Sequence, residues 1–194
     1  RIYGLPSWSP DGAFLAFASI SGAGQAFPTD NQVLLVDRDG NLIRSVYDDT
    51  HIPVYYNWSP DSAQIGLLTQ SASNQTFALR RVAVDGIGGE AIDVGNPLYW
   101  AWAPDSASLL VHASHTRLAA LSLDTVVQER DLGLRLGAFS APAISPDGRH
   151  VLATVATSPN TQELARIDLS TGGAQPLSAV ANQAAFTWSP DGTR

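Results

Sequence analysis

The amino-acid sequence predicts an all-β fold built from one repeated unit. A short motif occurs five times, with its first residue at Trp8, Trp58, Trp102, Ile144 and Trp188. Successive copies are 50, 44, 42 and 44 residues apart. A period of about 40–45 residues is typical of β-propellers, in which each blade is a sheet of four strands. The sequence therefore predicts a β-propeller of four-stranded antiparallel blades, with four complete blades and the start of a fifth.

The motif itself has the composition of a tight turn. Its first copy reads Trp-Ser-Pro-Asp-Gly from Trp8 to Gly12. Pro favours the second position of a type I turn, Ser and Asp bond to nearby backbone groups, and Gly accepts a positive φ. Ser62 and Ser106 replace Gly in two copies, where a left-handed backbone costs about 1 kcal/mol. We expect a structural role for the motif residues Trp8, Pro10, Asp11, Trp58, Pro60, Asp61, Trp102, Pro104, Asp105, Pro146, Asp147, Trp188, Pro190 and Asp191.

The same elements follow each motif in order. An apolar run comes first, at 14–18, 65–68, 109–111 and 151–155. A second run ends near Asp37, Asp85, Asp124 or Asp168, and these residues step by 48, 39 and 44. A turn and a third strand follow, at 42–47, 90–94, 126–132 and 175–177, before the strand that leads into the next motif. The predicted blades are 2–53, 54–97, 98–137 and 138–183, and residues 184–194 begin the next.

These strands are apolar on both faces. A sheet with one face in water would alternate between apolar and polar residues. Blades that pack face to face cover both sides of each sheet, so the pattern favours a propeller. A two-sheet sandwich also has many short strands. It would not repeat its phase this regularly.

Composition restricts the classes of function. The chain has 194 residues, of which 44% are hydrophobic and 15% charged, with a net charge of −7. An acidic chain without a basic stripe is a poor nucleic-acid binder. There is no Cys, which excludes disulfides and thiol catalysis, and no apolar run is long enough to insert into a membrane. Because the chain begins with Arg1 and contains no Met, we expect it to be internal to a longer gene product.

The motif and the strands around it resemble a known family. The Trp-Ser-Pro-Asp-Gly turns, the Leu-Ala-Phe-Ala-Ser strand at 15–19 and Val-Asp-x-Asp-Gly at Val36–Gly40 resemble the WD-repeat-like, TolB-type β-propeller repeats. The resemblance implies blades around a central channel, with the Trp strand innermost and six or more blades in the ring. The missing blades would come from the rest of the gene product or from another chain.

The resemblance also implies a function. TolB-type domains engage a protein or peptide partner through loops on one face of the ring, without a cofactor, and this favours a periplasmic or extracytoplasmic location. The alternative is the propeller portion of an enzyme. It would be a gate of the prolyl-oligopeptidase type, or a propeller lyase, with the catalytic residues elsewhere.

Two loops are the candidate binding sites, because function in repeat folds is concentrated in loops. One is the insertion at 19–31. The other runs through 48–53 into an inner strand, and its candidate binding residues are Asp48, Asp49, His51, Tyr55 and Tyr56. Acidic and aromatic side chains beside a concavity suit a basic or peptide ligand. The alternative is a solvated loop followed by aromatic residues that pack between blades.

Other patterns carry no clear chemistry. The segment 37–41 lacks the acidic positions of a calcium loop. His112 and His115 are too few for zinc, and His51 and His150 belong to other units. Gly-x-Ser-x-Gly does not occur. We therefore expect no catalytic residue, metal or cofactor site.

Overall fold

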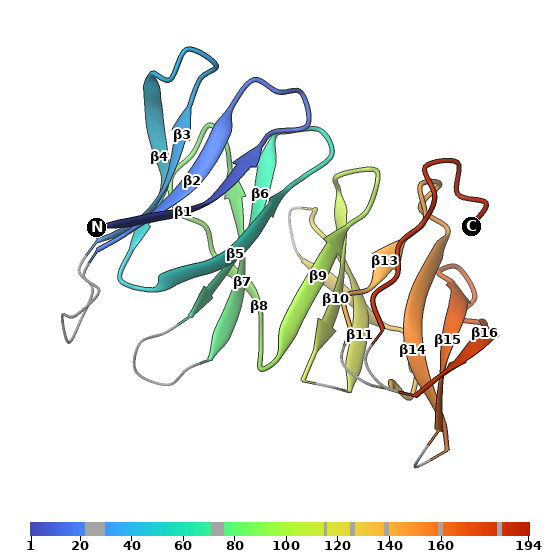
Figure 1. Ribbon diagram of the computed structural model, residues 1–194. Helices are drawn as coiled ribbons and strands as arrows, with labels where there is room; N and C mark the ends of the chain where they lie inside the picture. The colour runs from blue at the N-terminus through green and yellow to red at the C-terminus, as the bar shows by residue number, and fades with distance from the viewer. Residues whose placement is uncertain are drawn as a thin grey trace. The chain divides into compact units, whose positions relative to one another are not determined.

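The computed structural model describes residues 1–21, 30–70, 76–114, 116–124, 127–137, 140–158, 161–181 and 184–194. These residues form four antiparallel sheets of four strands each (Figure 1). None of them forms a helix that could cross a lipid bilayer. Most of the predicted loop at 19–31 lies outside the described residues, as does His115.

The chain divides into two compact units, Arg1–Gly95 and Asn96–Arg194, each with two sheets. Unit 1 contains blade 1, which is β1 (Ile2–Trp8), β2 (Leu15–Ile20), β3 (Asn31–Val36) and β4 (Leu42–Asp49), and blade 2, which is β5 (Ile52–Trp58), β6 (Gln64–Gln70), β7 (Phe77–Ala83) and β8 (Ala91–Gly95). Unit 2 contains blade 3, which is β9 (Leu98–Trp102), β10 (Ser108–Ala113), β11 (Arg117–Ser122) and β12 (Gln128–Asp131), and blade 4, which is β13 (Ala143–Ile144), β14 (His150–Ser158), β15 (Thr161–Asp168) and β16 (Ala174–Val180).

All four blades share one topology, and they share one register at the motif. Consecutive strands pair with each other, so every blade is a simple meander. The first motif residue pairs with the same position of the second strand in each blade, as in Trp8↔Leu15, Trp58↔Ile65, Trp102↔Leu109 and Ile144↔Val151. This identity of register confirms the predicted four-stranded antiparallel blades.

The core of unit 1 lies between its two blades. Side chains of β2, β3 and β4, including Ala16, Leu35 and Val46, are buried in one cluster with Trp58 and Leu67 of blade 2. The Trp58 indole Nε1–H also donates to the carbonyl of Ser7 on β1, at 3.2 Å. Blade 1 is therefore covered on this face by blade 2, as the apolar strands predict.

Unit 2 repeats this arrangement. Leu110 and Leu118 of blade 3 are buried with Val151 and Ile167 of blade 4. Residues 184–188 form no ladder with another described strand, but the Trp188 indole Nε1–H donates to the Ala143 carbonyl at 3.0 Å. Ser7 and Ala143 both immediately precede the first motif residue of their blade, so the two indoles make equivalent contacts.

The five motif turns have the same backbone. The fifth motif residue has a positive φ in every copy, with values of 66°, 64°, 59°, 72° and 69° at Gly12, Ser62, Ser106, Gly148 and Gly192. In the first copy the Asp11 carboxylate accepts the Ser9 hydroxyl at 2.6 Å and the Ala13 N–H at 2.9 Å. The Ser9 hydroxyl oxygen in turn accepts the Phe14 N–H at 3.0 Å. The hydrogen bond from Ser9 is the main reason that the pKa of Asp11 is lowered.

The third copy lacks this serine, because Ala103 stands in its place. The turn still closes through the Ser106 N–H, which donates to the Ala103 carbonyl at 3.0 Å. The Asp105 carboxylate instead accepts the Ser108 hydroxyl, at 3.1 and 3.2 Å. This copy therefore has one fewer connection between the start of the turn and its aspartate.

We predict that Ala103→Ser raises the free energy of unfolding by about 0.5–1 kcal/mol, because the added hydroxyl restores a hydrogen bond present in the other copies. The matched control is Ser59→Ala, which removes the 2.6 Å bond to Asp61 and should lower stability by a similar amount. Urea unfolding of both variants measures the effect. Lower stability of Ala103→Ser, or unchanged stability of Ser59→Ala, would show that the serine is not what orders the turn.

Candidate functional site

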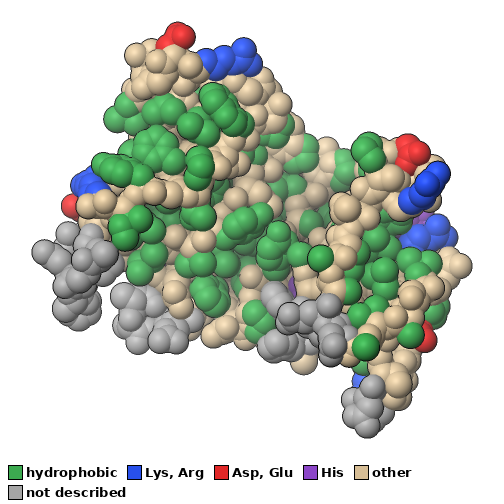
Figure 2. Space-filling view, in the orientation of Figure 1, with side chains coloured by type: hydrophobic (Ala, Val, Ile, Leu, Met, Phe, Trp, Pro, Cys, Tyr) green, Lys and Arg blue, Asp and Glu red, His purple; other side chains and the backbone are tan. Residues whose placement is uncertain are grey.

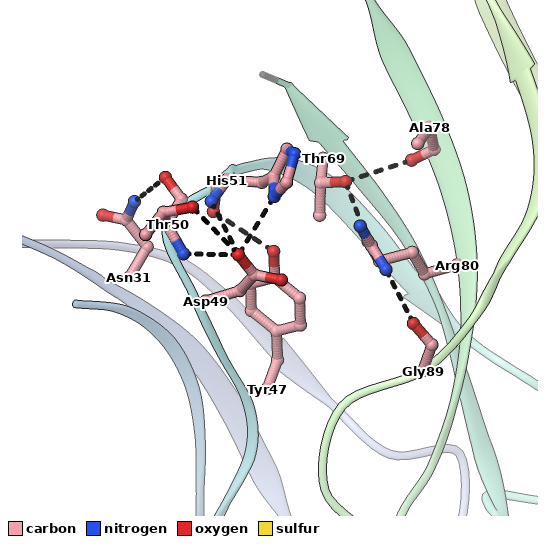
Figure 3. A network of polar contacts seen from close by, with 9 residues as sticks. All are labelled: Asn31, Tyr47, Asp49, Thr50, His51, Thr69, Ala78, Arg80 and Gly89. Atoms are coloured by element: carbon pink, nitrogen blue, oxygen red, sulfur yellow. Dashed lines mark hydrogen bonds and ion pairs between the residues drawn. The ribbon is translucent and has the colours of Figure 1, made fainter. Parts of the chain in front are cut away.

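The turn between β4 and β5 is a compact polar cluster at one end of unit 1 (Figure 3). β1 ends at the motif turn and β3 ends at the 37–41 hairpin turn at the same end of the sheet, so β4, which runs the other way, ends at the opposite end. At this end Asp49 Oδ1 accepts four hydrogen bonds from the next two residues. The donors are Thr50 N at 2.5 Å, Thr50 Oγ1 at 3.1 Å, His51 N at 3.3 Å and His51 Nδ1 at 3.0 Å.

Electrostatics favour the ionised form of Asp49. Partial burial raises its pKa, but the hydrogen bonds from His51 and Thr50 outweigh this and hold the pKa below its usual value. A carboxylate has no proton to give, so His51 Nδ1 is the donor. The side chains of His51 and Asp49 are 36% and 34% exposed, so the pair is accessible from solvent.

Two further residues hold the turn from blade 1. The Tyr47 hydroxyl donates to the His51 carbonyl at 3.2 Å, and Asn31 Nδ2 donates to the Thr50 carbonyl at 3.1 Å. Both Tyr47 and Asn31 are fully buried. Burial is also the main reason that the pKa of Tyr47 is raised, so its hydroxyl remains a donor at neutral pH.

Blade 2 contributes a cation beside this turn. Arg80 Nε donates to the Thr69 hydroxyl at 3.2 Å, and Arg80 Nη1 donates to the Gly89 carbonyl at 2.8 Å. The positive charge of Arg80 acts on Tyr47 and partly offsets the effect of burial on the pKa of that residue. Figure 3 shows Thr69 between the Arg80 side chain and the Asp49 turn. Thr69 and Arg80 of blade 2 therefore act on Tyr47, which in turn holds the β4–β5 turn.

Asp48 lies next to this cluster but outside it. Its side chain is exposed, and Oδ2 accepts Gln32 Nε2 at 2.9 Å. Gln32 Oε1 accepts Arg1 Nη1 at 3.3 Å. Asp48 and Asp49 are neighbours in a strand, so their side chains leave on opposite faces. One carboxylate orders the turn, and the other faces solvent.

The two tyrosines of the candidate site, Tyr55 and Tyr56, lie on opposite faces of β5. Tyr56 is 4% exposed, and its hydroxyl donates to the Leu5 carbonyl of blade 1. Tyr55 is 36% exposed on the other face of β5. Trp100, at the offset equivalent to Tyr56, is completely buried. The structure thus brings Asp49 and His51 together and places Tyr56 between the blades.

The remaining candidates lie apart from this turn. Asp37 accepts the Asp39 and Asn41 N–H groups at 2.9 and 2.8 Å, so it caps a hairpin turn. His112 is buried on β10 with Nδ1 2.9 Å from the Ser140 carbonyl. The His150 ring lies 6.5 Å from that of Trp188. Over the described ranges, no three His, Asp or Glu side chains gather as metal ligands would.

Sequence reasoning included Asn31 only as the end of the candidate loop 19–31, and it missed Gln32 and Tyr47, because each falls in or beside a predicted strand. The available signal was polarity, since Asn31 and Gln32 begin an otherwise apolar run. Tyr47 carried no such signal. Its hydroxyl is recognisable only when β4 and β5 are in place.

Comparison with known proteins identifies the fold. TolB from Acinetobacter baumannii superposes with a TM-score of 0.66 and 17% identity, over 98% of this chain and 47% of that one. The Cps50 (Swd1) β-propeller domain of Myceliophteria thermophila gives 0.54 and 14%, over 90% and 57%.

The chain has a β-propeller fold. It shares this fold with Kuenenia stuttgartiensis hydrazine synthase, at a TM-score of 0.59 and 18% identity over 96% of this chain and 52% of that one. The propeller chain described here spans about half the length of the TolB structure. No family model matches its sequence, and no curated protein matches it.

We predict that Asp49→Asn lowers the free energy of unfolding by about 1–2 kcal/mol, because an amide oxygen is a weaker acceptor for the four donors of the turn. The control is Asp48→Asn, which removes the same charge from the same strand. That variant should change stability by less than about 0.5 kcal/mol. Urea unfolding at neutral pH compares them, and a larger loss for Asp48→Asn would contradict the assignment of the ordering role to Asp49.

Proposed function

We propose that the chain is a β-propeller binding module that engages a protein or peptide partner at the end of unit 1 that carries the β4–β5 turn. The observation that supports this is that the two adjacent carboxylates, Asp48 and Asp49, have different roles. The Asp49 carboxylate accepts hydrogen bonds from Thr50 and His51, so the backbone of the turn is ordered in the absence of a partner. Asp48 and Tyr55 are exposed on the strands that the turn connects.

The chemistry of these residues favours a basic partner. The net charge of −7 attracts cations at a distance, and Asp48 provides a local carboxylate. Tyr55 offers a flat, partly exposed ring with little conformational entropy to lose on binding. An ordered turn lowers the entropic cost of association, which is the general advantage of a preorganised site. His51 is held by Asp49 through Nδ1 and by Tyr47 through its carbonyl, so it contributes to the ordered turn.

The proposal includes further blades that lie outside this sequence. On β1, Tyr3 and Trp8 are 64% and 53% exposed. They pair with Ser19 and Leu15 of β2, so both lie on the face of the sheet that carries Leu15 and Phe17. Figure 2 shows hydrophobic side chains gathered over the part of unit 1 that Figure 1 labels β1 and β2. Where blade 2 covers blade 1, the Trp58 indole N–H donates to the Ser7 carbonyl. Trp8 is the residue of blade 1 that corresponds to Trp58. A preceding blade, from the same gene product or another chain, would cover this face and extend the ring.

Selection of a random peptide library displayed on phage tests the binding site. We expect enriched peptides to contain Lys or Arg and to bind the double variant Asp48→Asn/Tyr55→Ala at least about tenfold more weakly, because that variant removes both the charge and the ring. The control is Asp39→Asn, which removes an exposed charge at the motif end of blade 1. Failure to enrich basic peptides, or equal binding to all three proteins, would contradict the proposed site.

The exposed β1 face makes a separate prediction. The chain should self-associate in a concentration-dependent manner, because contiguous exposed apolar surface is rare on monomeric proteins. Trp8→Lys should weaken this association at least about fivefold in sedimentation-velocity experiments. Ile87→Lys is the control, because Ile87 is 70% exposed but lies in the β7–β8 turn. Monomeric behaviour at all concentrations, or an equal effect of both variants, would show that the β1 face needs no covering blade.

A further inference from the structure

One copy of the motif has no indole, and this changes the contact between blades 3 and 4. Ile144 occupies the motif position that Trp58 occupies in blade 2 and Trp188 in the fifth copy. Its register is the same, because Ile144 pairs with Val151 as Trp58 pairs with Ile65. Trp58 and Trp188 each reach across to a carbonyl of the preceding blade. The shorter side chain of Ile144 has no donor to make that bond.

A cavity of about 410 Å³ lies beside Ile144. Its apolar lining includes Pro104, Leu110 and Leu169, and it falls entirely within unit 2. Its volume lies in the range of about 300–1,000 Å³ that is usual for ligand sites. The space is therefore much larger than a packing defect.

The blades have not closed up around the smaller side chain. A Cβ placed on Gly148 would lie 3.6 Å from Cδ of Pro104, in the motif turn of the preceding blade. A Cβ placed on Gly192 would lie 3.5 Å from Cδ of Pro146 in the same way, although Trp188 is present in that copy. The turns thus stack with equal spacing with and without the indole. The spacing set by the rest of the repeat keeps the cavity open.

The surroundings of the cavity match an indole and a positive charge. Ala101 pairs with Leu110 as Ser7 pairs with Ala16, so the Ala101 carbonyl corresponds to the one that accepts the Trp58 N–H. Two carboxylates, Asp105 and Asp147, also line the cavity. The hydrogen bond from Ser145 is the main reason that the pKa of Asp147 is lowered, so Asp147 is ionised at neutral pH.

We propose that the cavity beside Ile144 binds the tryptophan side chain of a partner polypeptide that has Lys or Arg next to that tryptophan. The indole occupies the volume that the chain's own tryptophan fills in other copies, and the neighbouring cation lies near Asp105 and Asp147. Charge complementarity with these two carboxylates favours a polypeptide that supplies both groups. The site belongs to unit 2 and is independent of the β4–β5 turn of unit 1.

Titration of the ¹⁵N-labelled chain with Ac-Trp-Lys-NH₂, followed by NMR, tests the proposal. We expect shifts of the Ala103, Ile144 and Leu169 amide signals, with those of Asp49 and His51 unchanged. Ac-Leu-Lys-NH₂ should bind at least about tenfold more weakly because it lacks the ring, and Ac-Trp-Glu-NH₂ about threefold or more because its charge is reversed. Tryptamine should bind no more tightly than the Trp-Lys peptide.

Ile144→Trp is the decisive variant, because it restores the missing indole from within the chain. It should weaken binding of Ac-Trp-Lys-NH₂ at least about tenfold while the remaining NMR signals stay dispersed. If this variant unfolds, Ala120→Phe fills the same cavity from β11 and should have the same effect. Three results would overturn the proposal: equal binding of the Trp and Leu peptides, unchanged binding to a folded variant with the cavity filled, or tighter binding of tryptamine than of the peptide. Because these signals lie in unit 2, failure here leaves the proposed site in unit 1 as a separate question.

Discussion

The contact on which unit 1 depends is the Trp58 indole that blade 2 places against blade 1, and Trp188 makes the equivalent contact with blade 4 in unit 2. Trp58 is buried against blade 1, and its N–H bonds to Ser7. Removing about 200 Å² of indole from water is worth up to about 5 kcal/mol, whereas one neutral hydrogen bond contributes about 1 kcal/mol. Burial therefore supplies most of the free energy of the Trp58 contact between the two blades. The hydrogen bond selects which carbonyl the ring faces and so sets the register between blades.

The motif turn makes this contact repeat. The fifth motif residue is left-handed and reverses the chain at once, so the first motif residue pairs in the same register with the strand after the turn in all four blades. The cost of the positive φ at Ser62 is partly offset by a hydrogen bond, because the Asp11 N–H of the preceding blade donates to the Ser62 hydroxyl at 3.1 Å. The same geometry also explains the cavity beside Ile144. Where the repeat keeps its spacing but loses its ring, a space of defined shape is left.

The fold was predictable from the sequence because the same turn-forming residues occur five times at nearly constant spacing. Proline, aspartate and glycine at fixed offsets specify a turn whatever the surrounding blade. The candidate site was only partly predictable. Asp49 and His51 are close in sequence and meet in the structure, but Tyr55 and Tyr56 could not be assigned to their faces, because a register shift between Pro53 and Tyr55 interrupts the alternation of β5. The buried donors Asn31 and Tyr47 reach the turn only through tertiary packing.

Hydrogen exchange of the indole N–H protons, measured by NMR, tests the central contact most directly. The structure places the Trp58 N–H in a buried bond to Ser7 and leaves more than half of the Trp8 surface exposed. Exchange at Trp58 should therefore be at least about a hundredfold slower than at Trp8, since it requires the two blades to separate. Equal exchange rates at the two indoles would contradict the account, because the blades of unit 1 would not then be held together by that ring.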